Sequence, residues 1–193
     1  MTASANDREV PVISLREAPG ERAKWGRSLT TVLAWSVVEA LVVTNQWQIS
    51  SKLRVAALRA FGAQIEDGVI FRPRTRVKFP WKLKIGADSW IGEGVWIHNQ
   101  DQVTIGRDVV ISQDTFLTTG SHAHRRDMGL ITRPILVADG AWVTSKCVVV
   151  GGVRIGRSAL VTPLSVVTHA VEANAIVTGN PATAVGTRFK DFE

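Results

Sequence analysis

The sequence predicts an all-β solenoid: a chain wound into about five stacked coils, with helices at its amino-terminal end. Three observations predict this fold class. Apolar residues return every six positions over residues 65–171, a small residue follows four places after most of them, and an apolar helical segment precedes the repeat. A period of six fits neither an α-helix nor the simple alternation of a hairpin strand. It suits coils built from three short, flat edges.

The fifteen leading positions of the repeat are all apolar, which places them in a central column. They divide into five coils, residues 65–82, 85–102, 105–122, 137–154 and 155–172. Stacking lets each backbone pair with the coils above and below at about 4.8 Å. Small residues at the fifth place of each hexad fit the inner corners, where Trp81 and Asp101 are the exceptions and Cys147 is a buried filler. The leading residues are Ile65, Phe71, Val77, Ile85, Ile91, Ile97, Ile105, Ile111, Leu117, Val137, Val143, Val149, Ile155, Val161 and Val167.

The segments before the repeat are predicted to be a flexible arm, residues 1–24, and a helical region, residues 25–62. The first helix runs from Trp25 to about Thr44 and the second from about Trp47 to Phe61, where Gly62 ends it. Their apolar stripes comprise Leu29, Val32, Leu33, Ser36, Val37, Ala40 and Leu41 in the first helix, and Ile49, Leu53, Ala56, Ala57 and Ala60 in the second.

Two roles for these helices stay open. They could cap the open end of the solenoid, whose strand edges would otherwise lack backbone partners. Alternatively, they could rest on a membrane surface with Trp25, Trp35 and Trp47 near the lipid headgroups. The apolar run from Leu29 to Val43 is too short to cross a bilayer, and no secretory signal is evident, so we expect a cytoplasmic protein.

The net charge of +6, from 23 basic and 17 acidic residues, favours anionic partners such as a phosphate-bearing cofactor or an anionic membrane surface. No helix-turn-helix, zinc-finger or RNA-binding motif accompanies the charge, so nucleic acid is not an expected partner. The first coil carries four of the bases on one outward face, Arg72, Arg74, Arg76 and Lys78, which indicates either a solvated surface or a site for an anionic acceptor or lipid.

The repeat is interrupted once, by residues 123–136, and resumes in register at Val137. Long loops on rigid solenoids often hold function, because an insertion there disturbs the stacked core little. His122 stands immediately before this loop. His98 lies on the same side but roughly 13 Å away along the strand direction, too far for one zinc ion to bridge, and no metal is expected.

Three segments give the repeat a family likeness. Ile85-Gly86-Ala87-Asp88-Ser89 and the matching segments at Ile105 and Ile155 resemble the hexapeptide repeat of the left-handed parallel β-helix acyltransferases. The paired helices, the Phe-Gly-Ala-x-Ile segment at 61–65 and the Thr-Gly-Ser-His element at 119–122 are most similar to the exopolysaccharide branch of the colanic acid type. The resemblance covers residues 25–187, and the left hand comes from it alone.

The resemblance implies a β-helix over residues 63–178 with a short extension, 179–193, and a homotrimer with active sites between chains. It further implies that His122 is the general base, removing a proton from an acceptor hydroxyl that attacks the thioester of acetyl-CoA. Histidine suits this role because it titrates near neutral pH. His124 is the competing base, and Asn99, His124 and Arg125 are candidates for acceptor binding. Candidates for binding the cofactor are Ser145, Lys146, Gly151, Pro163, Thr168 and Arg188, with Ser145 also a candidate oxyanion donor.

The expected activity is O-acetylation of a sugar or glycolipid hydroxyl in surface polysaccharide biosynthesis. One alternative is acetyl transfer to a small diffusible acceptor, such as a xenobiotic, an amino acid or a nucleotide-sugar amine. Another is a scaffold without enzymatic activity. A scaffold gives no reason for a histidine at the root of the loop.

Overall fold

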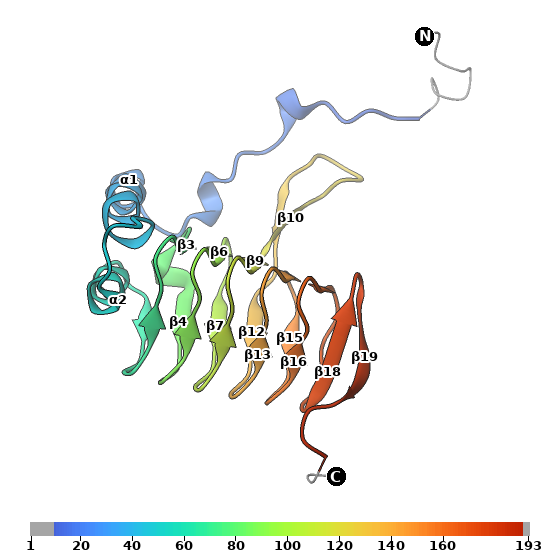
Figure 1. Cartoon of the computed structure of the whole chain (residues 1–193). Coiled ribbons are helices and arrows are strands. Elements are labelled where there is room, and N and C mark those ends of the chain that lie inside the picture. Colours follow the sequence, from blue (N-terminus) through green and yellow to red (C-terminus); the bar gives the residue numbers. More distant parts are fainter. Residues whose placement is uncertain (1–9, 191–193) are drawn as a thin grey trace.

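The structure is a computed structural model that describes residues 10–190 of the chain. Residues 1–9 of the predicted arm and the last three residues of the predicted extension lie outside the described residues. Figure 1 shows the stacked coils running from the helices at one end to a carboxyl-terminal hairpin at the other. The coils form a left-handed parallel β-helix, as predicted.

Each coil contributes one strand to each of three sheets. Sheet A contains β1 (Gln64–Ile65), β4 (Leu83–Ile85), β7 (Val103–Ile105), β12 (Ile135–Val137) and β15 (Arg154–Ile155). Sheet B contains β2 (Ile70–Phe71), β5 (Trp90–Ile91), β8 (Val110–Ile111), β13 (Trp142–Val143), β16 (Leu160–Val161), β18 (Ala175–Gly179) and β19 (Ala182–Thr187). Sheet C contains β3 (Arg76–Val77), β6 (Trp96–His98), β9 (Phe116–Thr118), β14 (Val148–Val150) and β17 (Val166–Val167).

The strand register confirms the predicted column. In sheet C, for example, Val77, Ile97 and Leu117 are aligned partners, and the alignment continues through Val149 and Val167. All fifteen leading side chains are buried, with no more than 7% exposed. A sixth coil begins beyond the five predicted, because β18 pairs in parallel with β16 before β19 folds back against it.

The successive edges meet at three corners, which we call AB, BC and CA after the sheets they join. The small residues of the repeat fill these corners as predicted. Trp81 is half-buried instead, stacks on Phe79 and donates its indole N–H to the carbonyl of Trp25 at 2.7 Å. Ser121 is exposed, because the chain leaves the stacked coils one residue earlier, at Gly120.

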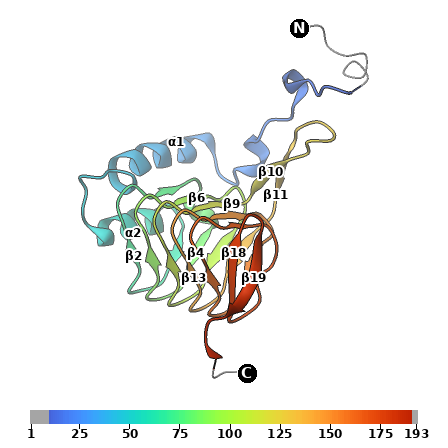
Figure 2. The ribbon, with the colours of Figure 1, turned by 45° about the vertical axis from the view of Figure 1, so that its right-hand side comes forward.

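The described helices lie against the first coil (Figure 2). They are α1 (Leu29–Val38), which continues as a π-helical turn η4 (Glu39–Val43), and α2 (Ser51–Ala60). Ser28 and Ser50 cap the two α-helices by accepting from backbone amides three residues on, and Gly62 follows α2 with φ +96°. Short 3₁₀ turns occupy η2 (Leu15–Glu17), η3 (Arg22–Lys24) and η5 (Pro80–Lys82).

Side chains from the helices bind the exposed backbone edge of the first coil. The Glu39 carboxylate accepts from the amide of Val77 at 2.7 Å, and the Trp35 indole donates to the carbonyl of Val77 at 2.8 Å. Ser51 accepts from the amide of Phe71 at 2.8 Å. The Arg59 guanidinium donates to the carbonyl of Ile65 at 2.8 Å. The helices therefore cap the solenoid, as one of the two predicted roles requires.

The helices turn a different face inward from the one their apolar stripes predicted. In α1 and η4, Trp35 and Val43 are buried while Leu33, Val37 and Leu41 are exposed. In α2 the buried residues are Arg54, Val55 and Leu58, and the predicted side is largely exposed, with Ile49 and Leu53 among its exposed residues. The inward face is selected by hydrogen bonds to the first coil and to the turn between the helices, which helical periodicity does not reveal. No helix within residues 10–190 is long and apolar enough to cross a membrane.

Candidate active site

The interruption after the third coil is a hairpin that projects from the CA corner (Figure 1). Its strands, β10 (Gly120–His122) and β11 (Leu130–Thr132), pair antiparallel, with His122 opposite Leu130. At the base, Thr119 donates its amide to the carbonyl of His98 at 3.3 Å and accepts from the amide of Arg133 at 3.0 Å. The excursion thus starts three residues before the predicted boundary at 123, and its root is joined to the second coil.

The tip of the hairpin is a tight turn held by its own hydrogen bonds. Ala123 donates its amide to the carbonyl of Gly129 at 2.9 Å and accepts from the amide of Met128 at 3.2 Å. Met128 adopts a left-handed backbone with φ +57°. The carboxylate of Asp127 accepts from the amide of Gly129 at 2.9 Å. These contacts set the direction of the Met128 carbonyl.

That carbonyl orients His122. The Nδ1 atom of His122 lies 2.7 Å from the carbonyl oxygen of Met128. Because a carbonyl oxygen only accepts, Nδ1 carries the proton of the neutral ring, and Nε2 keeps its lone pair. The His122 side chain is exposed and lines a hollow, so Nε2 is the nitrogen available to take a proton from a bound hydroxyl.

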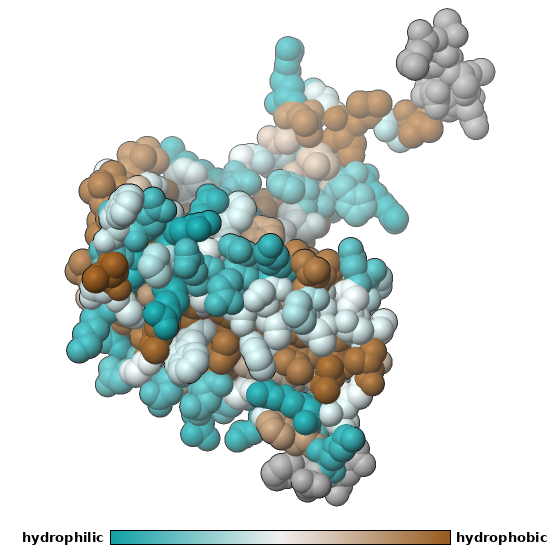
Figure 3. Space-filling model, in the orientation of Figure 1, coloured by the Kyte–Doolittle hydropathy of each residue, from teal (hydrophilic) through white to brown (hydrophobic). Residues whose placement is uncertain are grey.

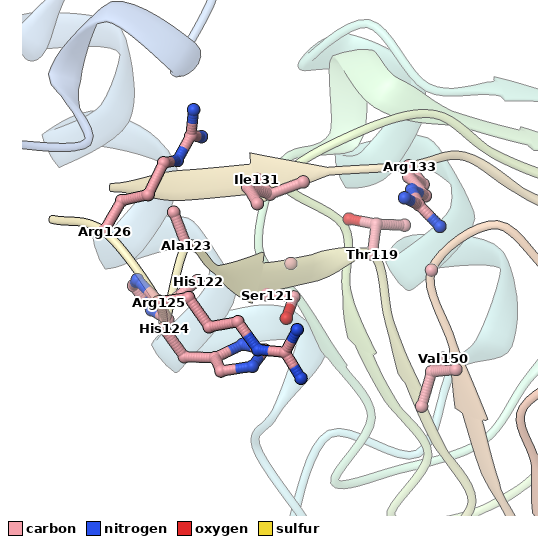
Figure 4. Close-up of a pocket in the computed structure, with 12 residues that line it drawn as sticks. Thr119, Ser121, His122, Ala123, His124, Arg125, Arg126, Ile131, Arg133 and Val150 are labelled. Carbon is pink, nitrogen blue, oxygen red and sulfur yellow. The ribbon is translucent and has the colours of Figure 1, made fainter. Parts of the chain in front are cut away.

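The hollow beside His122 has a volume of about 570 Å³. Figure 4 shows the two strands of the hairpin along it, with Val150 of the fourth coil on its opposite side. Three arginines contribute to its wall, and this positive charge suits an anionic ligand. Its lining residues are Thr119, Gly120, Ser121, His122, Ala123, His124, Arg125, Arg126, Ile131, Arg133, Val150 and Gly151.

Gly151 is required by the close approach of the fourth coil to the hairpin root. A Cβ atom at Gly151 would lie 2.7 Å from the carbonyl oxygen of Thr119 and 3.0 Å from that of Arg133. Both contacts are to backbone, which cannot rotate away. Any larger residue at this position would displace the root of the hairpin and, with it, His122.

Four of the residues predicted from the sequence meet at this hollow: His122, His124, Arg125 and Gly151. Thr168 lies at the same corner one coil further on, because β17 pairs with β14 in register. Its hydroxyl is 2.9 Å from Nδ1 of His169.

The other predicted cofactor residues lie at different corners of the same chain. Ser145, Lys146 and Pro163 follow sheet B strands at the BC corner, where the Ser145 hydroxyl donates to Gln113 at 3.0 Å. Arg188 lies at the AB corner and donates to the carbonyl of Gly140 at 2.8 Å. Within one chain, therefore, these residues do not join the hollow beside His122.

Asn99, predicted as a candidate for acceptor binding, does not line the hollow beside His122. Its side chain is fully buried. The amide oxygen accepts from the Phe79 amide at 3.0 Å, and the amide nitrogen donates to the carbonyls of Phe79 at 2.7 Å and Lys82 at 3.0 Å. Asn99 thus closes a turn of the first coil and has no side-chain group facing the hollow.

Arg126 and Arg133 line the hollow but were not predicted as site residues. Both belong to the hairpin segment that the sequence marks as an interruption, and basic side chains flanking the histidine were the signal available. A second cleft, of about 310 Å³, lies between α1 and the first strands of sheet C and includes His98 and Lys78. Burial there, together with the positive charge of Lys78, lowers the pKa of His98.

Within residues 10–190 no group of three or more potential ligands is placed to hold a metal ion.

Comparison with known proteins connects this geometry to an activity. No family model matches the chain. The chain is 34% identical over 164 residues to the Escherichia coli (strain K12) protein WcaF, named as a colanic acid biosynthesis acetyltransferase, a match that covers 84% of this chain and 90% of WcaF. The chain is a hexapeptide-repeat acetyltransferase of the colanic acid branch. This confirms the resemblance found in the sequence.

Two solved structures agree with the fold of this acetyltransferase. The hexapeptide-repeat acetyltransferase VCA0836 of Vibrio cholerae, crystallised with acetyl-CoA, superposes with a TM-score of 0.77 at 22% identity, covering 89% of this chain and 100% of that one. A galactoside acetyltransferase in complex with coenzyme A gives a TM-score of 0.77 at 19% identity, covering 84% and 82%. At these identities the likeness establishes the shared fold.

Proposed function

We propose that this acetyltransferase moves the acetyl group of acetyl-CoA to a hydroxyl of a sugar or glycolipid during assembly of a surface polysaccharide, with His122 as general base. The observation that carries the proposal is the contact of His122 Nδ1 with the Met128 carbonyl, which leaves Nε2 free at the hollow. The relationship to WcaF supports a polysaccharide acceptor, and the acetyl-CoA complex of VCA0836 supports the donor.

The reaction follows from this arrangement. Nε2 of His122 takes the proton of the acceptor hydroxyl while that oxygen attacks the thioester carbonyl. The resulting tetrahedral intermediate collapses, the carbon–sulfur bond breaks, and the sulfur leaves with the proton held by His122. Transfer is direct, without an acetyl-enzyme. The Nδ1–H group keeps donating its hydrogen bond to the Met128 carbonyl throughout. This hydrogen bond stabilises the imidazolium that forms during the attack.

We also propose that the working unit is a homotrimer. His122 lies at the CA corner, whereas Ser145, Lys146 and Pro163 lie at the BC corner of the same chain. Rotation about a threefold axis would set the BC corner of one copy beside the CA corner of the next. Arg125 and Arg133 on the hairpin would then face a coenzyme held between chains, where their charge suits its phosphates. Measurement of the mass of the purified protein in solution tests this assembly.

Acetyl transfer from labelled acetyl-CoA to a panel of mono- and oligosaccharides and glycolipids tests the reaction. Removing the imidazole by His122→Ala should lower kcat by about 10²-fold or more, because proton transfer by a positioned side chain typically contributes that much. His124→Ala is the matched control, since His124 lines the same hollow two residues away: its kcat should stay close to that of the wild type, and loss of an acceptor contact would raise KM instead. The product should release acetate in mild base, as an ester does and an amide does not.

Three results would overturn parts of this proposal. Full turnover by His122→Ala would move the base elsewhere. A base-stable product would mean that the acceptor is an amine. Transfer to small diffusible acceptors with no transfer to any saccharide or glycolipid would replace the polysaccharide assignment.

A further inference from the structure

The helical cap carries an unpartnered apolar surface on its outer side. We call it the apolar ridge, and it consists of Leu29, Leu33, Val37, Leu41, Trp47, Ile49 and Leu53, each at least 41% exposed. The first four recur every fourth residue and therefore follow one side of α1 and η4. Figure 3 shows apolar side chains gathered over the helices at the upper left of the molecule.

The most exposed part of the ridge is the turn between η4 and α2. Trp47 is 84% exposed and Ile49 is 88% exposed. The turn is nevertheless ordered from beneath, because the buried guanidinium of Arg54 donates to the carbonyls of Val43, Asn45 and Gln48. Asn45 accepts from the amide of Trp47 at 2.9 Å. The fold therefore keeps these two large apolar side chains exposed to solvent rather than burying them.

The composition of α1 differs from that of an ordinary surface helix. A surface helix normally carries polar residues opposite its apolar stripe. In α1 the residues around the whole circumference are mostly apolar, yet Trp35 is its one residue buried against the coils in the described chain. Its outer side thus lacks the partner that such a composition indicates.

The charges of residues 22–60, the segment that includes the ridge, indicate the kind of partner. Arg22, Lys24, Arg27 and Lys52 are exposed. Between residues 22 and 60 the sequence has one acid, Glu39, and its carboxylate faces the first coil, where it accepts from the amide of Val77. Within residues 22–60, exposed apolar side chains thus accompany exposed bases and no outward-facing acid, a composition that is complementary to a bilayer with anionic headgroups.

We propose that the apolar ridge docks this protein on an anionic lipid surface, with α1 lying in the plane of the interface and Trp47 and Ile49 inserted. None of the described helices spans a membrane, so this contact is peripheral. The inference goes beyond acetyl transfer and does not rest on it. It would also bring the hairpin, which rises from the same side of the coils as α1 in both views, toward acceptors held in the membrane (Figures 1 and 2).

Flotation of the purified full-length protein with phosphatidylcholine vesicles, with and without phosphatidylglycerol, tests this proposal. The protein should float with the anionic vesicles, less with neutral ones, and less at high salt. The double substitution Trp47→Ser/Ile49→Ser should weaken binding by about 10-fold or more, because it removes two large side chains from the interface. Val185→Ser is the matched control, since Val185 is 60% exposed on β19 at the opposite end, and it should bind like the wild type.

Absence of flotation, or undiminished flotation of the double variant, would overturn the proposal. So would a lower oligomer mass of the double variant without lipid, because the ridge would then be an interface between protein chains. Acetyl transfer to a soluble acceptor should be unchanged in the double variant. Failure of lipid binding is therefore distinguishable from failure of the catalytic proposal.

Discussion

Removal of the Asp127 carboxylate should slow the reaction without affecting the solenoid. Asp127→Ala deletes the acceptor for the Gly129 amide in a turn where Met128 adopts φ +57°. A left-handed backbone costs a residue with a side chain roughly 1–2 kcal/mol, and one hydrogen bond offsets about 0.5–1.5 kcal/mol of this. Since 1.4 kcal/mol is tenfold, the equilibrium constant for forming the turn that directs the Met128 carbonyl toward His122 should fall about 2- to 10-fold. We expect kcat to fall by up to that factor, because the rate follows the fraction of molecules that hold the turn.

Steady-state release of the CoA thiol measures this effect, and Asp127→Asn is its control. Asparagine loses the same charge as alanine does but keeps an oxygen that can accept from Gly129, so it should restore kcat. The melting temperature should be the same in both variants, because the turn lies outside the stacked core. Equal rates for the two variants, or an Asp127→Ala enzyme as fast as the wild type, would refute the proposed positioning of His122.

Three further predictions concern the scaffold. Ile111→Ala should reduce the free energy of unfolding by about 2–5 kcal/mol in chemical denaturation, because its fully buried side chain lies in register between Ile91 and Val143; a smaller loss would mean that the column repacks. Asn99→Ala should lower the melting temperature while leaving KM for the acceptor unchanged, and a selective rise in KM would restore its acceptor role. Burial raises the pKa of the Glu39 carboxyl, so the folded state binds its proton more tightly than the unfolded state does. The stabilisation from this proton is present below the unfolded pKa and is lost as pH rises through the folded pKa. The melting temperature of Glu39→Gln minus that of the wild type should therefore increase from pH 4 to pH 8. A difference that does not change with pH would contradict this.

The coils could be predicted because their rule is local and repeated. A residue such as Ile111 is placed by its distance from Ile105 and Leu117, and a slip of one position would turn every leading side chain outward. The same rule located the hairpin after the third coil to within three residues, and with it His122.

The orientation of the helices could not be predicted in this way. Helix α1 is apolar around most of its circumference, so its periodicity does not distinguish Trp35 from Leu33 or Val37. The inward face is chosen by the hydrogen bond of the Trp35 indole to Val77, which is 42 residues away in the chain. A contact with a partner that distant has no signature in a helical pattern.

The candidate site was predictable in part for a related reason. Asn99 stands one coil before His122, but its amide is used by the backbone of Phe79 and Lys82. The repeat gives the corner on which Ser145 lies, whereas Arg188 follows the repeat and its corner is known only from its hydrogen bond to Gly140. The sequence also does not show which corners of neighbouring copies meet, because that depends on how whole solenoids pack against one another.

The hydrogen bonds of helical side chains to the first coil also bear on whether copies of the chain can polymerise. A stack of flat parallel edges is a template on which further chains could add end to end, as in a growing amyloid fibril. Glu39, Trp35, Ser51 and Arg59 already occupy the backbone groups that an incoming chain would need. We therefore expect these four side chains to limit polymerisation as well as to add stability, and substitutions that remove them to make the protein insoluble before they reduce catalysis.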